Sequence, residues 1–94
     1  MDYIFIQRKG DMEAITKSKK SLSKLTLDEL VNKYNGQAKL GFTGVHQQAR
    51  LVVAMHQEFL GRINESPIKI EKNLIISFKG TIALIDYKIV YLNG

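Results

Sequence analysis

The chain of 94 residues contains no cysteine and no tryptophan, and it has a single proline. Without cysteine it can form neither a disulfide nor a thiolate metal site, and no thiolate can serve as a nucleophile. Secreted domains of this size often depend on disulfides for stability. The lack of cysteine therefore favours a cytoplasmic protein.

Long hydrophobic runs free of charge are also lacking. The most apolar stretch, residues 74–92, contains Lys79, Asp86 and Lys88, and charges near the middle of a span are costly in a bilayer. Residues 1–8 have an acid at Asp2 and no extended apolar core, unlike a signal peptide. We expect no membrane partner and no secretion.

Acidic residues are outnumbered by basic ones, nine to fourteen, which gives a net charge of +5. Most of the basic residues are lysines, whereas arginine is the residue better suited to base edges and phosphate forks. The charge therefore permits a nucleic acid or an acidic partner without specifying either.

The remaining composition is that of an ordinary globular domain, with 45% hydrophobic and 24% charged residues. At this length we expect a single domain over residues 1–94. The strongest pattern is an amphipathic helix at about Val45 to Leu60, with Thr43 as its expected N-cap and Gly61 at its end. Its apolar face is broad, which predicts packing on more than one side.

A shorter helix is predicted to begin after Thr26, because Thr26 and Glu29 fit a capping box. Asn35-Gly36 is its expected end. Nearer the N-terminus, residues 3–8 favour a strand and residues 9–11 a turn. Residues 12–17 fit either a second strand or a helical turn, and residues 18–24 a polar connection.

After Pro67 the pattern becomes extended. Residues 68–71, 74–79, 81–86 and 89–92 are rich in β-branched and aromatic residues with short connections, which predicts an antiparallel meander. The fold expected is α+β in two layers: a mostly antiparallel sheet, made of the N-terminal strand or hairpin and the C-terminal meander, packed on one long and one shorter helix.

No residue pattern indicates an active site. His46 and His56 are ten residues apart on the predicted helix, about 280° around it, so they do not share a face. Neither histidine has a ligand type four residues further on, and no pair of carboxylates is marked out. We expect a non-enzymatic protein without metal or cofactor.

Two features are compatible with a nucleic acid. Lys17, Lys19, Lys20 and Lys24 form a segment free of acids, although a solvated loop is the simpler interpretation. Residues 41–44 read Gly-Phe-Thr-Gly between the two predicted helices, the G-x-x-G pattern with which K-homology domains clamp a nucleic-acid backbone. The same region could also form a helix-turn-helix. This alternative site consists of the four lysines with Gly41, Gly44, His46 and Arg50.

The C-terminal strands indicate a different function. They carry more apolar residues than one face of a small sheet can bury, so a protein partner or a second copy of the chain could cover the rest. The candidate residues for self-association are Ile76, Phe78, Leu84, Ile89 and Tyr91. We therefore predict a small binding or interaction module that self-associates through apolar sheet surface.

Overall fold

Residues 2–92, the part of the chain that the computed structural model describes, form three helices and five strands. In chain order these are β1 (Tyr3–Ile4), α1 (Asp11–Leu22), α2 (Leu27–Leu40), α3 (His46–Ile63), β2 (Ile68–Ile70), β3 (Ile75–Phe78), β4 (Ile82–Ile85) and β5 (Lys88–Tyr91). The predicted α+β class is confirmed. None of these helices is long and apolar enough to cross a membrane.

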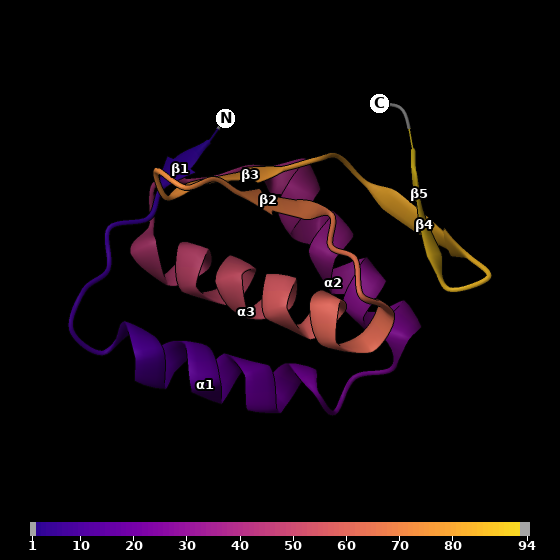
Figure 1. Ribbon diagram of the computed structural model, residues 1–94, viewed down its shortest axis with the longest axis horizontal. Coiled ribbons are helices and arrows are strands. Elements are labelled where there is room, and N and C mark those ends of the chain that lie inside the picture. Colours follow the sequence, from indigo (N-terminus) through magenta and orange to yellow (C-terminus); the bar gives the residue numbers. More distant parts are fainter. Residues whose placement is uncertain (1, 93–94) are drawn as a thin grey trace.

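The long helix α3 lies at the centre of the molecule. Figure 1 shows the sheet of β1, β3 and β2 on one side of α3 and the helix α1 on the other. Because of this arrangement, α3 buries residues around much of its circumference: Ala49, Val52, Ala54, Met55 and Phe59. Its broad apolar face is thus covered by two layers.

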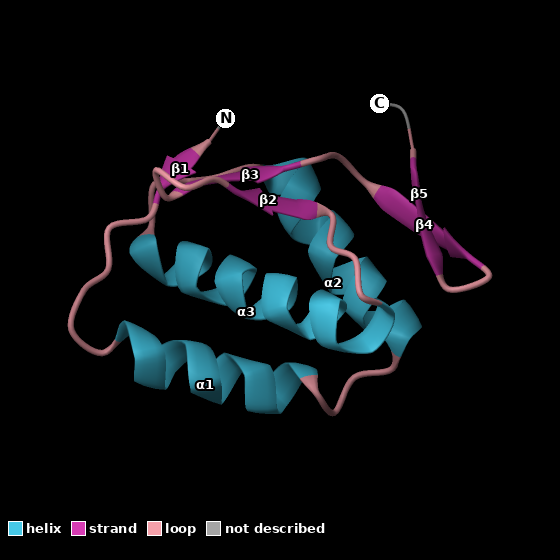
Figure 2. Cartoon of the chain, viewed as in Figure 1, coloured by secondary structure: helices cyan, strands magenta, loops and turns pink. Residues whose placement is uncertain are grey.

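The helices α1 and α3 run parallel to each other. Asp11, at the start of α1, contacts Arg50 in the first turns of α3, and the carbonyl of Leu22, at the end of α1, accepts a hydrogen bond from Arg62 near the end of α3. In a parallel pair the chain must run back from the end of the first helix to the start of the second. Helix α2 makes this connection from the end of α1 to the start of α3 (Figure 2).

The strands form two antiparallel sheets, one with the order β1-β3-β2 and one made of the β4–β5 hairpin. The predicted meander is therefore divided between β3 and β4. The hairpin turn is Asp86-Tyr87, and both residues have positive φ, 53° and 62°. This is the conformation of a two-residue turn that matches strand twist, although glycine or asparagine usually occupies it.

The side chains of α2 hold the two sheets together. The Tyr34 hydroxyl donates to the Gly80 carbonyl at 2.7 Å and also lies 3.1 Å from the Pro67 carbonyl. The neighbouring Asn35 side chain donates to the Ile82 carbonyl at 2.9 Å and accepts from the Ile82 amide at 2.8 Å. Asn35 thus pairs with β4 as a residue of an adjacent strand would.

The N-terminal segment differs from the prediction. Residues 11–22 form a helix, so the helical alternative for residues 12–17 is confirmed and no second strand forms there. The connection predicted over residues 18–24 begins only at Ser23. The strand over residues 3–8 is reduced to Tyr3–Ile4. The helix forms because Ile15 and Leu22 pack into the core, although most of its other side chains are polar.

Both predicted helix ends were placed too early. The helix α2 continues through Asn35-Gly36 to Leu40, and α3 continues through Gly61 and ends where Asn64 adopts a φ of 57°. Helix α3 also starts without a capping side chain, because its N-cap is Val45 and not the expected Thr43, which bonds the Gln48 side chain. The capping box of Thr26 and Glu29 is confirmed.

Candidate functional site

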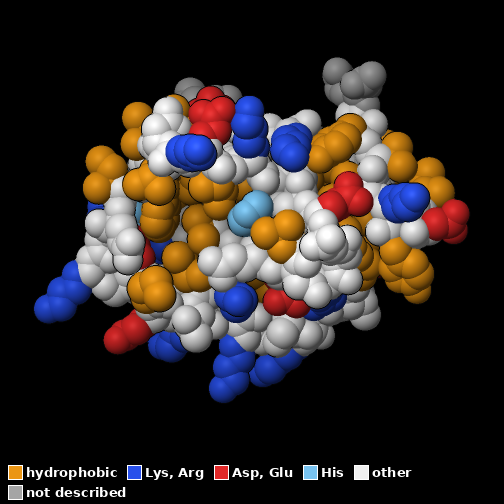
Figure 3. Space-filling model, viewed as in Figure 1, with side chains coloured by type: hydrophobic (Ala, Val, Ile, Leu, Met, Phe, Trp, Pro, Cys, Tyr) orange, Lys and Arg blue, Asp and Glu red, His pale blue; other side chains and the backbone are white. Residues whose placement is uncertain are grey.

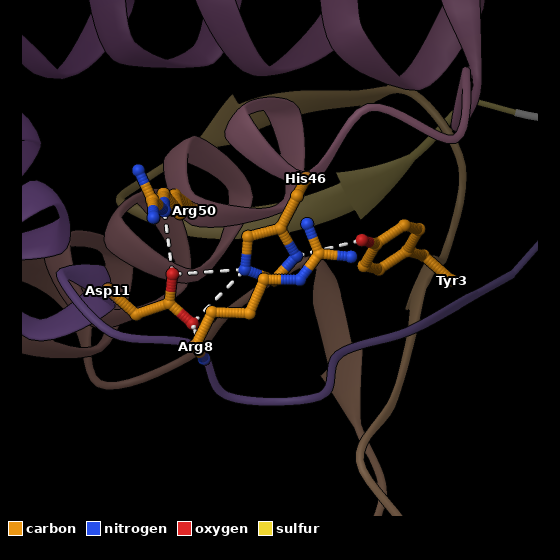
Figure 4. Close-up of polar contacts among 5 residues, drawn as sticks. All are labelled: Tyr3, Arg8, Asp11, His46 and Arg50. Carbon is orange, nitrogen blue, oxygen red and sulfur yellow. Dashed lines mark hydrogen bonds and ion pairs between the residues drawn. The ribbon is translucent and has the colours of Figure 1, made fainter.

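A buried polar cluster joins the N-terminal segment to the starts of α1 and α3 (Figure 4). At its centre is Asp11, whose exposed fraction is 1%. Its Oδ1 atom accepts from Nε of Arg50 at 2.6 Å and lies 3.0 Å from Nε2 of His46. Its Oδ2 atom accepts from the backbone amide of Arg8 at 2.6 Å. The Asp11 carboxylate is therefore bonded from three directions.

The position of Asp11 depends on Gly10. Gly10 has a φ of 88°, a left-handed conformation that a side chain would strain. It reverses the chain so that the Asp11 carboxylate can reach back to the Arg8 amide. Since a helix N-terminus favours a negative charge, the first residue of α1 suits a carboxylate.

The protonation of Asp11 follows from these contacts. Burial by itself would raise the pKa of its carboxyl group, but the hydrogen bonds from the Arg8 amide, Arg50 and His46 outweigh burial and lower the pKa to about 2. The carboxylate is therefore ionised at neutral pH and acts only as an acceptor.

His46 connects this carboxylate to a tyrosine. Because Asp11 can only accept, Nε2 of His46 carries the hydrogen that bonds it. In the neutral ring Nδ1 is then an acceptor, and the Tyr3 hydroxyl donates to it at 2.8 Å. The ring of His46 also stacks on Phe5, with centroids 4.9 Å apart. A hydrogen-bonded line thus runs from β1 through α3 to α1.

The order of groups in this line, hydroxyl, imidazole and carboxylate, is that of a nucleophilic triad. A nucleophile also needs a cleft where a substrate can sit. Three hollows on the described surface are lined by neither Tyr3 nor His46, although one includes Gly10 and another includes Val45 and Gln47. The Tyr3 ring in turn packs on Phe42, with centroids 5.7 Å apart. These contacts favour a structural role for the cluster.

Other groups that could carry chemistry are separate from this cluster. His56 is half-buried, and its Nδ1 lies 2.8 Å from the Ser66 hydroxyl. Burial lowers the pKa of His56, and nearby Lys79 lowers it further. Among the described residues, no group of three or more histidine or acidic side chains could hold a metal ion.

The residues of the predicted nucleic-acid site are not brought together. His46 is buried and Arg50 is paired with Asp11. Gly41 and Gly44 flank the short loop before α3, whereas the lysines lie on the second half of α1 or just after it, at the opposite end of the parallel pair. Lys17, Lys20 and Lys24 are exposed, and Lys19 is half-buried.

The self-association candidates lie mainly on the inward side of the strands. Ile76 has no exposed surface, and Phe78, Leu84 and Ile89 are half-buried, whereas Tyr91 is 42% exposed. Their neighbours in the β4–β5 hairpin are more open. The exposed apolar side chains there are Ile85, Tyr87, Val90 and Leu92.

Half-buried Ala83 lies beside these four exposed residues. In the register of the hairpin, Ala83 pairs with Val90 and Ile85 with Lys88. Cross-strand partners share a face, so these residues form the outer face of the hairpin. Figure 3 shows hydrophobic side chains gathered over β4 and β5, with a second group near β1.

Sequence reasoning missed Tyr3 and Asp11 as members of a buried cluster. The sequence predicts a turn at Asp11 and places Tyr3 in the apolar pattern of a strand. An acid following glycine at the start of a helix was a local signal for Asp11, but its bond to His46 spans 35 positions. Comparison of the chain with protein-family models, with curated proteins and with solved structures gave no match.

Proposed function

We propose that this protein is a small interaction module that self-associates through the β4–β5 hairpin. One observation carries the proposal: the hairpin is left open both on its outer face and along β5. Ile85 and Tyr87 are 59% and 77% exposed, and β5 pairs with β4 alone among the described strands. An open edge beside apolar side chains is a common place for association.

The other edge of the hairpin, along β4, is partly covered. The Asn35 side chain forms hydrogen bonds with the amide and the carbonyl of Ile82 on β4. Helix α2 also packs along this strand. Strand pairing is therefore more hindered along β4 than along β5. A second copy of the chain offers the same open strand, which makes it a matching partner.

Size-exclusion chromatography with multi-angle light scattering tests this proposal. We expect the mass to rise from monomer towards dimer as the concentration reaches about 0.5 mM. Val90→Asp, which places a charge on β5 itself, should shift the curve towards monomer. Ile6→Asp is a matched control, because Ile6 is 67% exposed but lies outside the hairpin. A monomer over the whole range would overturn the proposal.

Binding to nucleic acid is a second candidate, supported by the exposed side chains of Lys17, Lys20 and Lys24. It predicts binding to DNA or RNA that weakens steeply with salt. Replacing these three lysines by glutamate should then abolish binding. Replacing Lys69, Lys72 and Lys88, which are exposed on the strands and their turns, is the matched control. Equal losses in both triple variants would contradict a site on α1.

A further inference from the structure

The open edge of β5 has a defined set of free backbone groups. The two-residue turn makes Ile85 and Lys88 a hydrogen-bonded pair, and such pairs alternate along an antiparallel ladder. Lys88, Val90 and Leu92 therefore direct their backbone groups towards β4, as the 2.8 Å bond from the Leu92 amide to the Thr81 carbonyl shows. Ile89 and Tyr91 direct theirs away from β4.

We infer that two copies of the chain pair antiparallel along β5 with the two-fold axis at Val90. This inference rests on the proposed self-association and names the strand and the register through which it occurs. In this register Ile89 faces Tyr91 of the second copy, and Tyr91 faces Ile89. All the outward backbone groups of β5 are then paired, and the two hairpins form one four-stranded sheet.

The side chains match in the same register. Val90 lies opposite Val90 of the second copy, and this row continues on each side into Ala83. Ile89 and Tyr91 form two symmetry-related pairs of a β-branched and an aromatic residue, a favourable cross-strand combination. Val90 and Tyr91 are 39% and 42% exposed, so both have surface left to bury.

The charges also permit this pairing. Lys88 lies opposite Leu92 of the second copy, so that no two lysines face each other across the axis. The net charge of +5 on each copy opposes association at long range. Because salt screens that repulsion, self-association should strengthen with salt. Binding to a nucleic acid would weaken under the same change.

Single cysteines test the register, because the chain has none of its own. Residues opposite each other in a non-hydrogen-bonded pair lie about 4.5 Å apart between Cα atoms, within the range of a disulfide. With oxidised glutathione as oxidant, Val90→Cys should give a disulfide-linked dimer as the main product. Ile85→Cys is the control. Ile85 is more exposed than Val90, but in the proposed sheet two strands lie between the two copies of residue 85, so they cannot form a disulfide.

The outcomes separate this inference from the proposed function. A dimer in solution that links best through Ile89→Cys, Tyr91→Cys or Ile85→Cys would overturn the register and leave self-association in place. A monomer in solution at every concentration would overturn both. Preferential linkage of Val90→Cys in a protein that also dimerises without cysteine would support both.

A second pair of variants avoids cysteine altogether. Val90→Lys places two like charges opposite each other at the axis and should weaken self-association about tenfold. Val90→Thr keeps a β-branched side chain and should change it much less. Circular dichroism would verify that both variants remain folded. Equal dimerisation of the two variants would contradict an axis at Val90.

Discussion

Nε2 of His46 lies 3.0 Å from Oδ1 of Asp11, and both side chains are almost completely buried. A buried carboxylate is tolerated only where donors surround it. Here Arg50 and the backbone of Arg8 supply the other donors. The pair therefore fixes how the starts of α1 and α3 meet.

Asp11→Ala should destabilise the protein strongly, because buried His46 and half-buried Arg50 would lose their common acceptor. We expect a Tm lower by roughly 10 °C or more. Glu13→Ala is the control, since Glu13 is an exposed acid in the same helical turn. Thermal unfolding followed by circular dichroism measures both, and similar small shifts would show that the cluster contributes little.

Acid should remove the contribution of Asp11. Its pKa is about 2 in the folded protein against 3.8 for the free side chain. A lowered pKa of an acid stabilises the folded state fully above pH 3.8, and this contribution disappears as the pH falls towards 2. Urea unfolding across that window should show a steeper loss of stability in the wild type than in Asp11→Asn. Parallel curves would contradict the assignment.

His56 should make stability depend on pH nearer to neutrality. Burial lowers its pKa in the folded state below the ordinary value of 6.5, so the unfolded chain takes up the proton first. The free energy of unfolding should therefore decrease as the pH falls below 6.5. His56→Gln should flatten this slope in urea titrations. An unchanged slope would assign the dependence to another group.

Tyr34→Phe should cost about 1–2 kcal/mol of stability, because one buried and one partly buried carbonyl would lose their shared donor. Those carbonyls belong to Pro67 and Gly80, at the junction of the two sheets. Tyr87→Phe, at an exposed hairpin position, is the control and should be close to neutral. Urea unfolding of both variants gives the comparison, and equal stabilities would rule out a role for the hydroxyl.

Asn35→Ala should loosen the hairpin. The variant leaves the Ile82 amide and carbonyl without the side-chain partner they have in the wild type, at a cost of about 1–3 kcal/mol. Hydrogen exchange of the Ile82 amide should accelerate more than that of core amides in α3. Asn32→Ala, an exposed neighbour on α2, is the control. Uniform acceleration across the protein would indicate global destabilisation instead.

Features encoded over a few neighbouring residues were predictable from the sequence. Thr26 and Glu29 form their capping box within four positions, and the Thr26 amide bonds the Glu29 carboxylate at 2.8 Å. The long helix was visible because its buried residues recur with the period of a helix. Its burial between two layers accounts for the breadth of that pattern.

Features that depend on distant contacts were not predictable. Asn35-Gly36 has the composition of a helix end, yet Asn35 turns towards β4, and Gly36 is exposed within α2. The helix α1 presents only a narrow apolar stripe, because it packs on a single neighbour, α3. The buried cluster needed Tyr3, Asp11 and His46 to be brought together from three elements, which no local spacing reveals.

The parallel arrangement of α1 and α3 also has a consequence for the order in which the protein can fold during synthesis. Tyr3 and Ile4 pair with β3, and Asp11 bonds to residues of α3. On the ribosome, the first 22 residues are therefore made long before their partners emerge. Helix α1 and strand β1 must remain unpacked until most of the chain has been translated, so the domain should fold late and as one unit.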